Sequence, residues 1–470
     1  MSNVRVTKKD IIWSYIAQFF NLGAGLITLP LVLHMLSEDE IGMNYLMLTV
    51  SSMVALLDFG FAPQFARNIT YVFSGAPELR KEGIAESIGK IDYTLLANMI
   101  KVAKKVYAIM AVLTLILMLT GGTAYIYKVT DGFTNVRHSL IIWIIYSVSV
   151  FFNIYYVYYS SLLTGRGQIM ESKKAMIAQR LTYICLTFVL LLSGMGLLGV
   201  VIANLLAPFV GRILSYRMFY DSEMKNHLAN SQPSSAEQKK LFLIIWYNAK
   251  KLGIVFIGSY AINKIGMFFA GLYLNLAEIA SYGLMIQLVT IISQLALTFN
   301  ISEQPLFNAY RTEGRKKELL EKFALTMNVY YVIFIVSSVA LILIGPWTLR
   351  LIGSNAVLPA GFILAIYCLI VLLEGNHGSF ATFIVTENKI PFVESSLIAG
   401  AAICIGSFLS LKFTTLGILG LVLVQGICQL VYANWKWPYV VCRDFHISFP
   451  TFLSIGFKQS LKLIPINHGR

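Results

Sequence analysis

Twelve stretches of about twenty mostly apolar residues follow one another along the chain, and this pattern limits what it can fold into. Such a stretch is long enough to cross the hydrocarbon core of a bilayer as a helix, where every backbone polar group must be satisfied internally. The composition agrees, because 57% of the residues are apolar and 13% are charged, against about half and a quarter in soluble domains. We therefore predict an all-α integral membrane protein. The expected spans cover approximately residues 11–33, 41–63, 106–127, 139–163, 177–193, 197–219, 250–272, 277–301, 325–346, 358–383, 393–411 and 417–438.

Positive charge alternates from one connection to the next. The N-terminus, every second connection and the C-terminal tail together carry 32 of the 37 Lys and Arg residues, whereas the opposite side carries 4 and Lys264 lies within a span. By the positive-inside rule, this predicts that both termini are cytoplasmic. The net charge of +14 is thus a feature of membrane topology, and nucleic acid is not an expected partner. The first run is too long for a cleavable signal peptide and lacks a small-residue cleavage site, so we expect an uncleaved helix.

The two halves of the sequence resemble each other weakly. Six spans per half give both halves the same orientation, so we expect two six-helix lobes around a central cavity, a known plan for transporters. The predicted divisions are an N-terminal lobe at 1–219, a cytoplasmic linker at 220–249, a C-terminal lobe at 250–440 and a cytoplasmic tail at 441–470. Three short segments recur in the same order: Glu40-Ile41 as Glu278-Ile279, Thr164–Ile169 as Thr386–Ile390, and Gly196–Val200 as Gly417–Leu421.

Several motifs of soluble enzymes are present in form only. The segment 194–199 matches GxGxxG but lies between two membrane spans, outside any βαβ pattern, and no GxxxxGK[ST] occurs. Glu374-x-x-His377 resembles half of a di-metal site, but such sites need a second copy. The five cysteines show no metal-ligand spacing and no disulfide framework. We therefore expect no metal, no cofactor and no catalytic residues.

Lys264 lies about fourteen residues into the seventh span, near the middle of the membrane. A charged side chain there costs at least about 2.5 kcal/mol, and such residues are functional candidates. The functional interpretation is a fixed cation that binds a phosphate group as a point charge. The structural interpretation is an ion pair with Asp58 or Glu374, or a lysine that extends toward the membrane surface.

Asp58 lies in the cytoplasmic third of the second span, before Gly60 and Pro63, which weaken the helix there. One interpretation is a cytoplasmic gate, in which Asp58 forms an ion pair between the lobes and Arg67 belongs to the same region. The other is a packing contact that caps broken backbone.

Glu374 and His377 are three residues apart and therefore share one face of the tenth span. A histidine beside a carboxylate can couple transport to protons, and the alternative is a buried hydrogen-bonded pair that fixes helix packing. In the fourth span, Asn153 and Tyr155 lie in an aromatic run whose hydroxyl-bearing rings suit sugars. Aromatic residues at the membrane interface are the alternative there.

The segment 58–69 (DFGFAPQFARNI) resembles a signature of bacterial O-antigen and polysaccharide flippases, which belong to the multidrug/oligosaccharidyl-lipid/polysaccharide exporter superfamily. Supporting matches are Gly271-Leu-Tyr-Leu274 with Ile279 and Tyr282, Gln304–Phe307 with Arg311 and Gly314, and Thr164–Gly167 after the fourth span.

This resemblance implies a substrate and a location. The substrate is an oligosaccharide on undecaprenyl pyrophosphate, moved by alternating access from the cytoplasmic to the periplasmic leaflet of the bacterial inner membrane. On this hypothesis Lys264, Asn153 and Tyr155 bind the substrate, and the partners are the lipid-linked glycan, membrane lipids and other polysaccharide-assembly proteins.

Three alternatives stay open. A drug or cation antiporter of the same superfamily shares the architecture and favours carboxylates in its cavity, such as Asp58 and Glu374. The lipid II flippase branch usually has fourteen helices, and the twelve spans expected here count against it. Membrane polysaccharide polymerases and ligases resemble one another in having a large periplasmic loop. The outward connections expected here are short, which counts against an enzyme of this kind.

Overall fold

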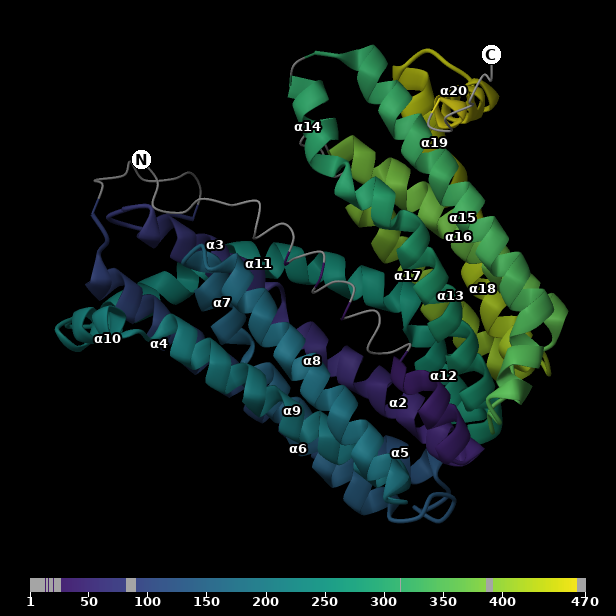
Figure 1. Ribbon diagram of the computed structural model, residues 1–470, viewed down its shortest axis with the longest axis horizontal. Helices are drawn as coiled ribbons and strands as arrows, with labels where there is room; N and C mark the ends of the chain where they lie inside the picture. Colours follow the sequence, from purple (N-terminus) through teal and green to yellow (C-terminus); the bar gives the residue numbers. More distant parts are fainter. Residues whose placement is uncertain are drawn as a thin grey trace, which may run out of the picture. The chain divides into compact units, whose positions relative to one another are not determined.

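The computed structural model describes residues 27–81, 90–312, 314–385 and 392–462, together with the single positions 13, 16 and 20. These residues are helical wherever they form regular secondary structure, so the all-α prediction is confirmed (Figure 1). Ten helical segments of the described chain are long and apolar enough to cross a membrane. The chain divides into two compact units, Met1–Ile257 and Gly258–Arg470.

The difference between ten spans and the expected twelve has two sources. The first expected run, 11–33, lies mostly outside the described residues. The seventh, 250–272, is interrupted at Lys264, between α11 (Ser235–Asn263) and α12 (Ile265–Tyr273). The prediction of twelve spans with cytoplasmic termini stays a prediction.

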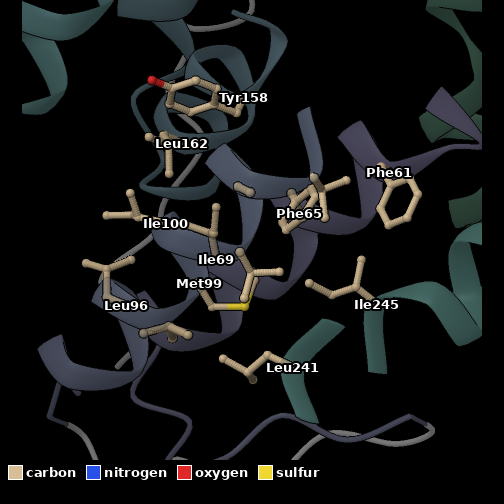
Figure 2. Close-up of a cluster of buried hydrophobic side chains, with 14 of the residues drawn as sticks. Phe61, Phe65, Ile69, Leu96, Met99, Ile100, Tyr158, Leu162, Leu241 and Ile245 are labelled. Atoms are coloured by element: carbon tan, nitrogen blue, oxygen red, sulfur yellow. The ribbon is translucent and has the colours of Figure 1, made fainter. Parts of the chain in front are cut away.

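The first unit is a helical bundle whose core includes aromatic and aliphatic side chains. Phe65, Tyr107 and Leu162 are completely buried there, and Leu241 and Ile245 of α11 join the same cluster (Figure 2). Part of the expected linker 220–249 is thus built into this core. The other elements of the unit are α2 (Glu38–Val54), the 3₁₀ turn η1 (Ala55–Asp58), α3 (Phe61–Phe73), α4 (Tyr93–Leu117), the π-helical turn η2 (Met118–Gly122), α5 (Thr123–Val129), α6 (Ser139–Tyr155), α7 (Val157–Gly165), α8 (Ile169–Leu192), α9 (Gly196–Phe219) and α10 (Ser222–Ala229).

The second unit packs around α15, the longest helix. Phe323 of this helix contacts Phe380, Phe383 and Phe452 through their rings, with centroids 4.1 to 5.5 Å apart. Phe452 belongs to the C-terminal helix, so part of the expected tail 441–470 is a packed helix. The elements that follow α12 are α13 (Leu276–Ser302), α14 (Gln304–Thr312), α15 (Lys316–Leu351), α16 (Gly361–Val385), α17 (Val393–Phe413), α18 (Gly417–Leu430), α19 (Ala433–Asp444) and α20 (Phe449–Leu461).

The recurring Glu40 and Glu278 have the same structural role in the two units. Each completes a capping box at the start of its helix, with Ser37 as the N-cap of α2 and Asn275 as the N-cap of α13. Such a box satisfies two backbone N–H groups that the first helical turn leaves without partners. The sequence repeat therefore corresponds to a repeated helix start.

Candidate functional site

The first unit contains a polar cavity of about 260 Å³ beside an interruption between α6 and α7. Its wall includes two cations, Lys173 and Arg212, and two amides, Asn153 and Gln179. Tyr156 lies at the interruption itself, with φ −91° and ψ 1°. Basic and amide side chains together offer many hydrogen-bond donors, which suits an anionic or sugar-bearing ligand.

Arg212 and Tyr156 form the centre of this wall. The guanidinium donates a hydrogen bond to the Tyr156 hydroxyl and also lies 4.2 Å from the centroid of the ring. No described carboxylate lies within 4.0 Å of Arg212. The guanidinium is therefore oriented by an aromatic ring while its positive charge is not neutralised by an ion pair.

Asn153 and Tyr155 occupy different surroundings. Asn153 lines the cavity and donates a hydrogen bond from Nδ2 to the Ser149 carbonyl oxygen, at 3.1 Å. Tyr155 is absent from the lining, and its ring contacts Phe151, with centroids 6.2 Å apart. The tyrosines that line this cavity are Tyr156 and Tyr159.

Two membrane-span arginines are missed by counting charges in connections. Helix α8 begins at Ile169, eight residues before the expected start at residue 177, so Arg180 lies in the middle of the span. Arg212 lies inside α9, five residues before Arg217 in its last turn. Both arginines lie inside the expected spans 177–193 and 197–219, but the charge count assigned them to the cytoplasmic connections beside those spans.

Asp58 lies where the second span breaks. The residues after it, Phe59 and Gly60, adopt left-handed conformations with φ of 44° and 74°. One carboxylate oxygen of Asp58 accepts a hydrogen bond from the Tyr107 hydroxyl at 2.8 Å, and the other accepts one from the Ala62 N–H at 3.4 Å. These are the contacts of a side chain that caps broken backbone.

Arg67 lies farther along α3 and is exposed. It donates a hydrogen bond to Gln64 Oε1. No ion pair within 4.0 Å joins Arg67 to Asp58.

Lys264 interrupts the seventh span. Its backbone, with φ −128° and ψ −23°, lies outside the helical region, and α12 begins at the next residue. The side chain is exposed, and no described carboxylate of its own unit, including Glu374, lies within 4.0 Å of it.

Glu374 and His377 of α16 bind different helices. Glu374 Oε2 accepts a hydrogen bond from Gln425 of α18 at 3.3 Å. His377 Nδ1 lies 2.7 Å from Oδ1 of Asn434 in α19. The shared helical face is thus divided between two neighbours.

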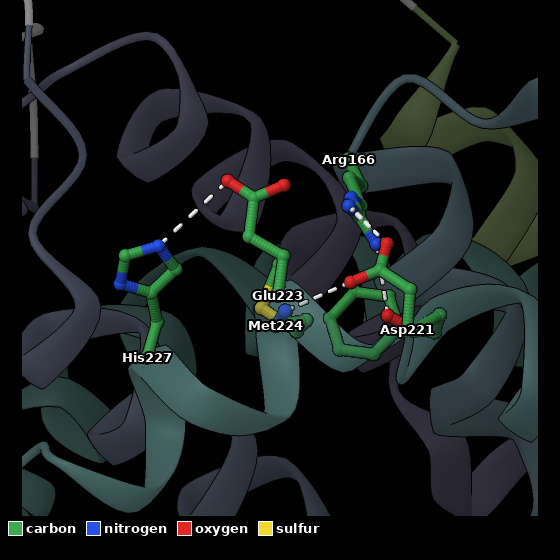
Figure 3. A network of polar contacts seen from close by, with 6 residues as sticks. Arg166, Asp221, Glu223, Met224 and His227 are labelled. Carbon is green, nitrogen blue, oxygen red and sulfur yellow. Dashed lines mark hydrogen bonds and ion pairs between the residues drawn. The ribbon is translucent and has the colours of Figure 1, made fainter.

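Arg166, from the segment Thr164–Gly167, connects the ends of three helices (Figure 3). It follows α7, donates from Nη1 to the Phe219 carbonyl oxygen at the end of α9, and pairs with Asp221 at 2.7 Å. Asp221 is the N-cap of α10 and accepts a hydrogen bond from the Met224 N–H at 2.8 Å. Partial burial acts to raise the pKa of Asp221, but these hydrogen bonds and the Arg166 charge hold that pKa below its usual range.

A family model described as polysaccharide biosynthesis protein matches residues 7–309. No curated protein sequence matches the chain significantly. The solved structure of the lipid II flippase MurJ in an inward closed conformation aligns with a TM-score of 0.63 at 14% identity, covering 97% of this chain and 91% of that chain.

A multidrug resistance MATE family transporter of the MOP superfamily is also similar. Its inward-facing conformation gives a TM-score of 0.59 at 16% identity, over 91% of this chain and 97% of that chain. Its outward-facing conformation gives 0.52 at 16% identity, over 93% of each chain. The fold is therefore that of membrane transporters and flippases rather than that of an enzyme.

Proposed function

Because this chain belongs to the polysaccharide biosynthesis protein family and shares its fold with transporters, we propose that it is a flippase for a lipid-linked glycan. It moves an oligosaccharide on undecaprenyl pyrophosphate from the cytoplasmic to the periplasmic leaflet of the bacterial inner membrane, by alternating access. A pyrophosphate with several sugars cannot enter hydrocarbon without losing its hydrogen bonds to water. The protein therefore has to supply a polar route for the head group while the lipid tail remains in the bilayer.

The observation that carries this proposal is the polar cavity with Lys173 and Arg212 in its wall. Two cations that no described carboxylate neutralises favour an anionic ligand over a cationic one. The amides of Asn153 and Gln179 supply donors and acceptors for sugar hydroxyl groups. One cavity therefore offers hydrogen-bond partners to both a phosphate group and a sugar.

The remaining candidate residues receive roles within the same proposal. Lys264 attracts the pyrophosphate, Tyr155 contributes to the aromatic surface for sugars, and Asp58 and Arg67 belong to the cytoplasmic gate. Glu374 and His377 couple transport to an ion. The proposed architecture is two six-helix lobes, 1–219 and 250–440, around a central cavity that opens to one side of the membrane at a time.

The test is transport of a lipid-linked oligosaccharide in proteoliposomes that contain the Arg212→Ala variant. A charge-assisted hydrogen bond is worth about 1.5–3 kcal/mol, so transport efficiency should fall roughly ten- to hundredfold. Arg217→Ala is the matched control, because Arg217 is an exposed arginine on the same helix outside the cavity lining, and it should leave transport unchanged. Equal transport rates for Arg212→Ala and the wild type would show that this cavity does not bind the transported substrate.

A drug or cation antiporter is the second candidate, and Glu374 is the observation that favours it. This carboxylate lies in a membrane span and accepts a hydrogen bond from Gln425, with no described cation within 4.0 Å. Such a group can bind a cation. The two proposals differ in the charge they select, so export of a lipophilic cation by the same proteoliposomes would favour the antiporter.

A further inference from the structure

The second unit contains a large apolar groove, separate from the polar cavity of the first unit. It has a volume of about 850 Å³ and lies among α15, α16, α19 and α20. Its wall includes Trp435, Tyr439 and Leu453, all of which are exposed. Because these helices cross or border the membrane, lipid chains are the apolar molecules that surround the groove.

The polar groups at the inner end of the groove already have partners. The Tyr331 hydroxyl donates to Oδ1 of Asn376 at 2.6 Å, and Asn434 lies 2.7 Å from His377 Nδ1. Asn376 and Asn434 are buried, so these contacts satisfy groups that water does not reach. The inner end of the groove therefore needs no polar ligand to satisfy its hydrogen bonds, and it is suited to a hydrocarbon chain.

A positive charge lies at the other end of the groove. Arg443, in the last turn of α19, lines the groove and is exposed, and no described carboxylate lies within 4.0 Å of it. Its guanidinium is 5.9 Å from the centroid of the Tyr439 ring. An apolar interior with an uncompensated cation at the mouth is complementary to an anionic amphiphile.

Helix α20 indicates where the membrane surface lies. Its inner face is fixed to α15, where Phe452 is buried and Asn328 donates a hydrogen bond to Ser460 at 2.8 Å. Its outer face carries an exposed apolar stripe with a four-residue spacing, and the exposed Lys458 and Lys462 follow the same helix. The stripe consists of Phe449, Leu453, Phe457 and Leu461. A helix with this pattern lies in the plane of the membrane interface.

The length of the groove fits one leaflet. From Trp435 to Arg443 the α19 helix rises about 12 Å, close to half of the roughly 30 Å hydrocarbon core. The mouth, at Arg443 in the last turn of α19, is followed along the chain by α20. Helix α20 lies at the end of the second unit where α15 begins (Figure 1), and the first residues of α15 are Lys316 and Lys317. Positive residues mark the cytoplasmic side, and that leaflet contains anionic lipids.

We propose that this groove binds a membrane glycerophospholipid with an anionic headgroup, with an acyl chain along α19 and the phosphate at Arg443. The occupant is a resident lipid rather than the transported substrate, because the much longer polyprenyl chain would extend out of a groove of this length. The site is independent of which head group the protein transports.

Native mass spectrometry of the full-length protein tests this site. The probes are phosphatidylglycerol and phosphatidylcholine with the same acyl chains, and a polyprenyl phosphate. Wild-type protein should retain phosphatidylglycerol over phosphatidylcholine. Arg443→Gln should weaken phosphatidylglycerol binding about tenfold, because it removes a charge-assisted hydrogen bond. Arg350→Ala is the matched control, an exposed arginine near the opposite end of α15, and should bind as the wild type does.

A second variant tests the hydrocarbon part of the site. Leu453→Trp places a larger side chain in the groove wall at a partly exposed position and should reduce binding of both phospholipids. Equal retention of phosphatidylglycerol and phosphatidylcholine by the wild type would overturn the proposal. So would unchanged binding in Arg443→Gln, or displacement of phosphatidylglycerol by polyprenyl phosphate at equal concentration, which would assign the groove to the transported lipid.

Discussion

Lys264 is a charged residue at a point where the backbone of an expected membrane span leaves helical geometry. Its backbone departs from helical geometry, and its exposed side chain has no described carboxylate of its own unit within 4.0 Å. An ion pair with Glu374, which the sequence left open, is not formed, because Glu374 bonds to Gln425. We propose that an anionic substrate reaches this lysine during transport.

The prediction for Lys264 is that Lys264→Ala abolishes glycan transport while leaving the amount of protein in the membrane unchanged. The substitution removes an exposed charge and leaves no buried partner unsatisfied, so folding should tolerate it. Transport and membrane abundance are measured together in cells that carry the variant as their only copy. Lys412→Ala, at an exposed lysine of the same unit, should retain transport. A wild-type rate for Lys264→Ala would contradict the phosphate role.

The sequence identifies some of the charged residues in membrane spans and misses others. Lys264 stands out because apolar residues flank it on both sides. Arg180 and Arg212 do not, because charge counting assigned both to the cytoplasmic side. Both lie inside the expected spans 177–193 and 197–219, so the error was in the charge count. Because α8 begins eight residues before its expected start, Arg180 lies at the middle of the helix rather than near its beginning. Hydropathy averages over a window and cannot detect the polar first turns of a long helix.

At the scale of elements, short connections between helices carry specific interactions. Arg166 ties the end of α9 and the start of α10 to the segment after α7 through two contacts of 2.7–2.8 Å. The segment Thr164–Gly167 resembles the family pattern. Its structural role can be recognised only from the structure, which places residues 219–221 beside it. The capping boxes, in contrast, are readable from the sequence, because all of their contacts lie within four residues.

The Arg166–Asp221 pair should stabilise the first unit in a pH-dependent way. Asp221→Asn keeps a good N-cap for α10 but removes the ion pair, so it should lower thermal stability modestly, by less than about 1 kcal/mol for a partly exposed pair. Because the pKa of Asp221 is lowered in the folded protein, its stabilisation is present above the unfolded pKa of about 3.9 and is lost as the pH falls through the folded value. The melting temperatures of the variant and the wild type should therefore differ at pH 7 and approach each other as the pH falls below about 4.

Unfolding of the detergent-solubilised protein measures this difference. Glu223→Gln is the control, since its pairing with His227 is longer, at 3.7 Å, and more exposed, and it should change stability less. A difference between Asp221→Asn and the wild type that stays constant across this pH range would show that the ion pair is not its cause.

At the scale of the whole molecule, the class of fold was predictable and the details of its division were not. The apolar runs require helices in a membrane, and the described chain is helical with ten such spans. The sequence placed a linker at 220–249, but Leu241 and Ile245 of that stretch are buried in the first unit. A helix with charged residues on its outer face and apolar residues on its inner face has the average composition of a polar linker, so composition alone does not reveal that it packs into a core.

A flippase for a lipid-linked glycan has to move its substrate from one leaflet of the membrane to the other. The most direct measurement is the distribution of undecaprenyl-linked oligosaccharide between the two leaflets in cells that lack this protein. We predict that the oligosaccharide accumulates facing the cytoplasm and that surface polysaccharide is lost, with both restored by the wild-type chain but not by Lys264→Ala. Unchanged surface glycan together with increased sensitivity to cationic drugs would contradict the flippase and favour the antiporter.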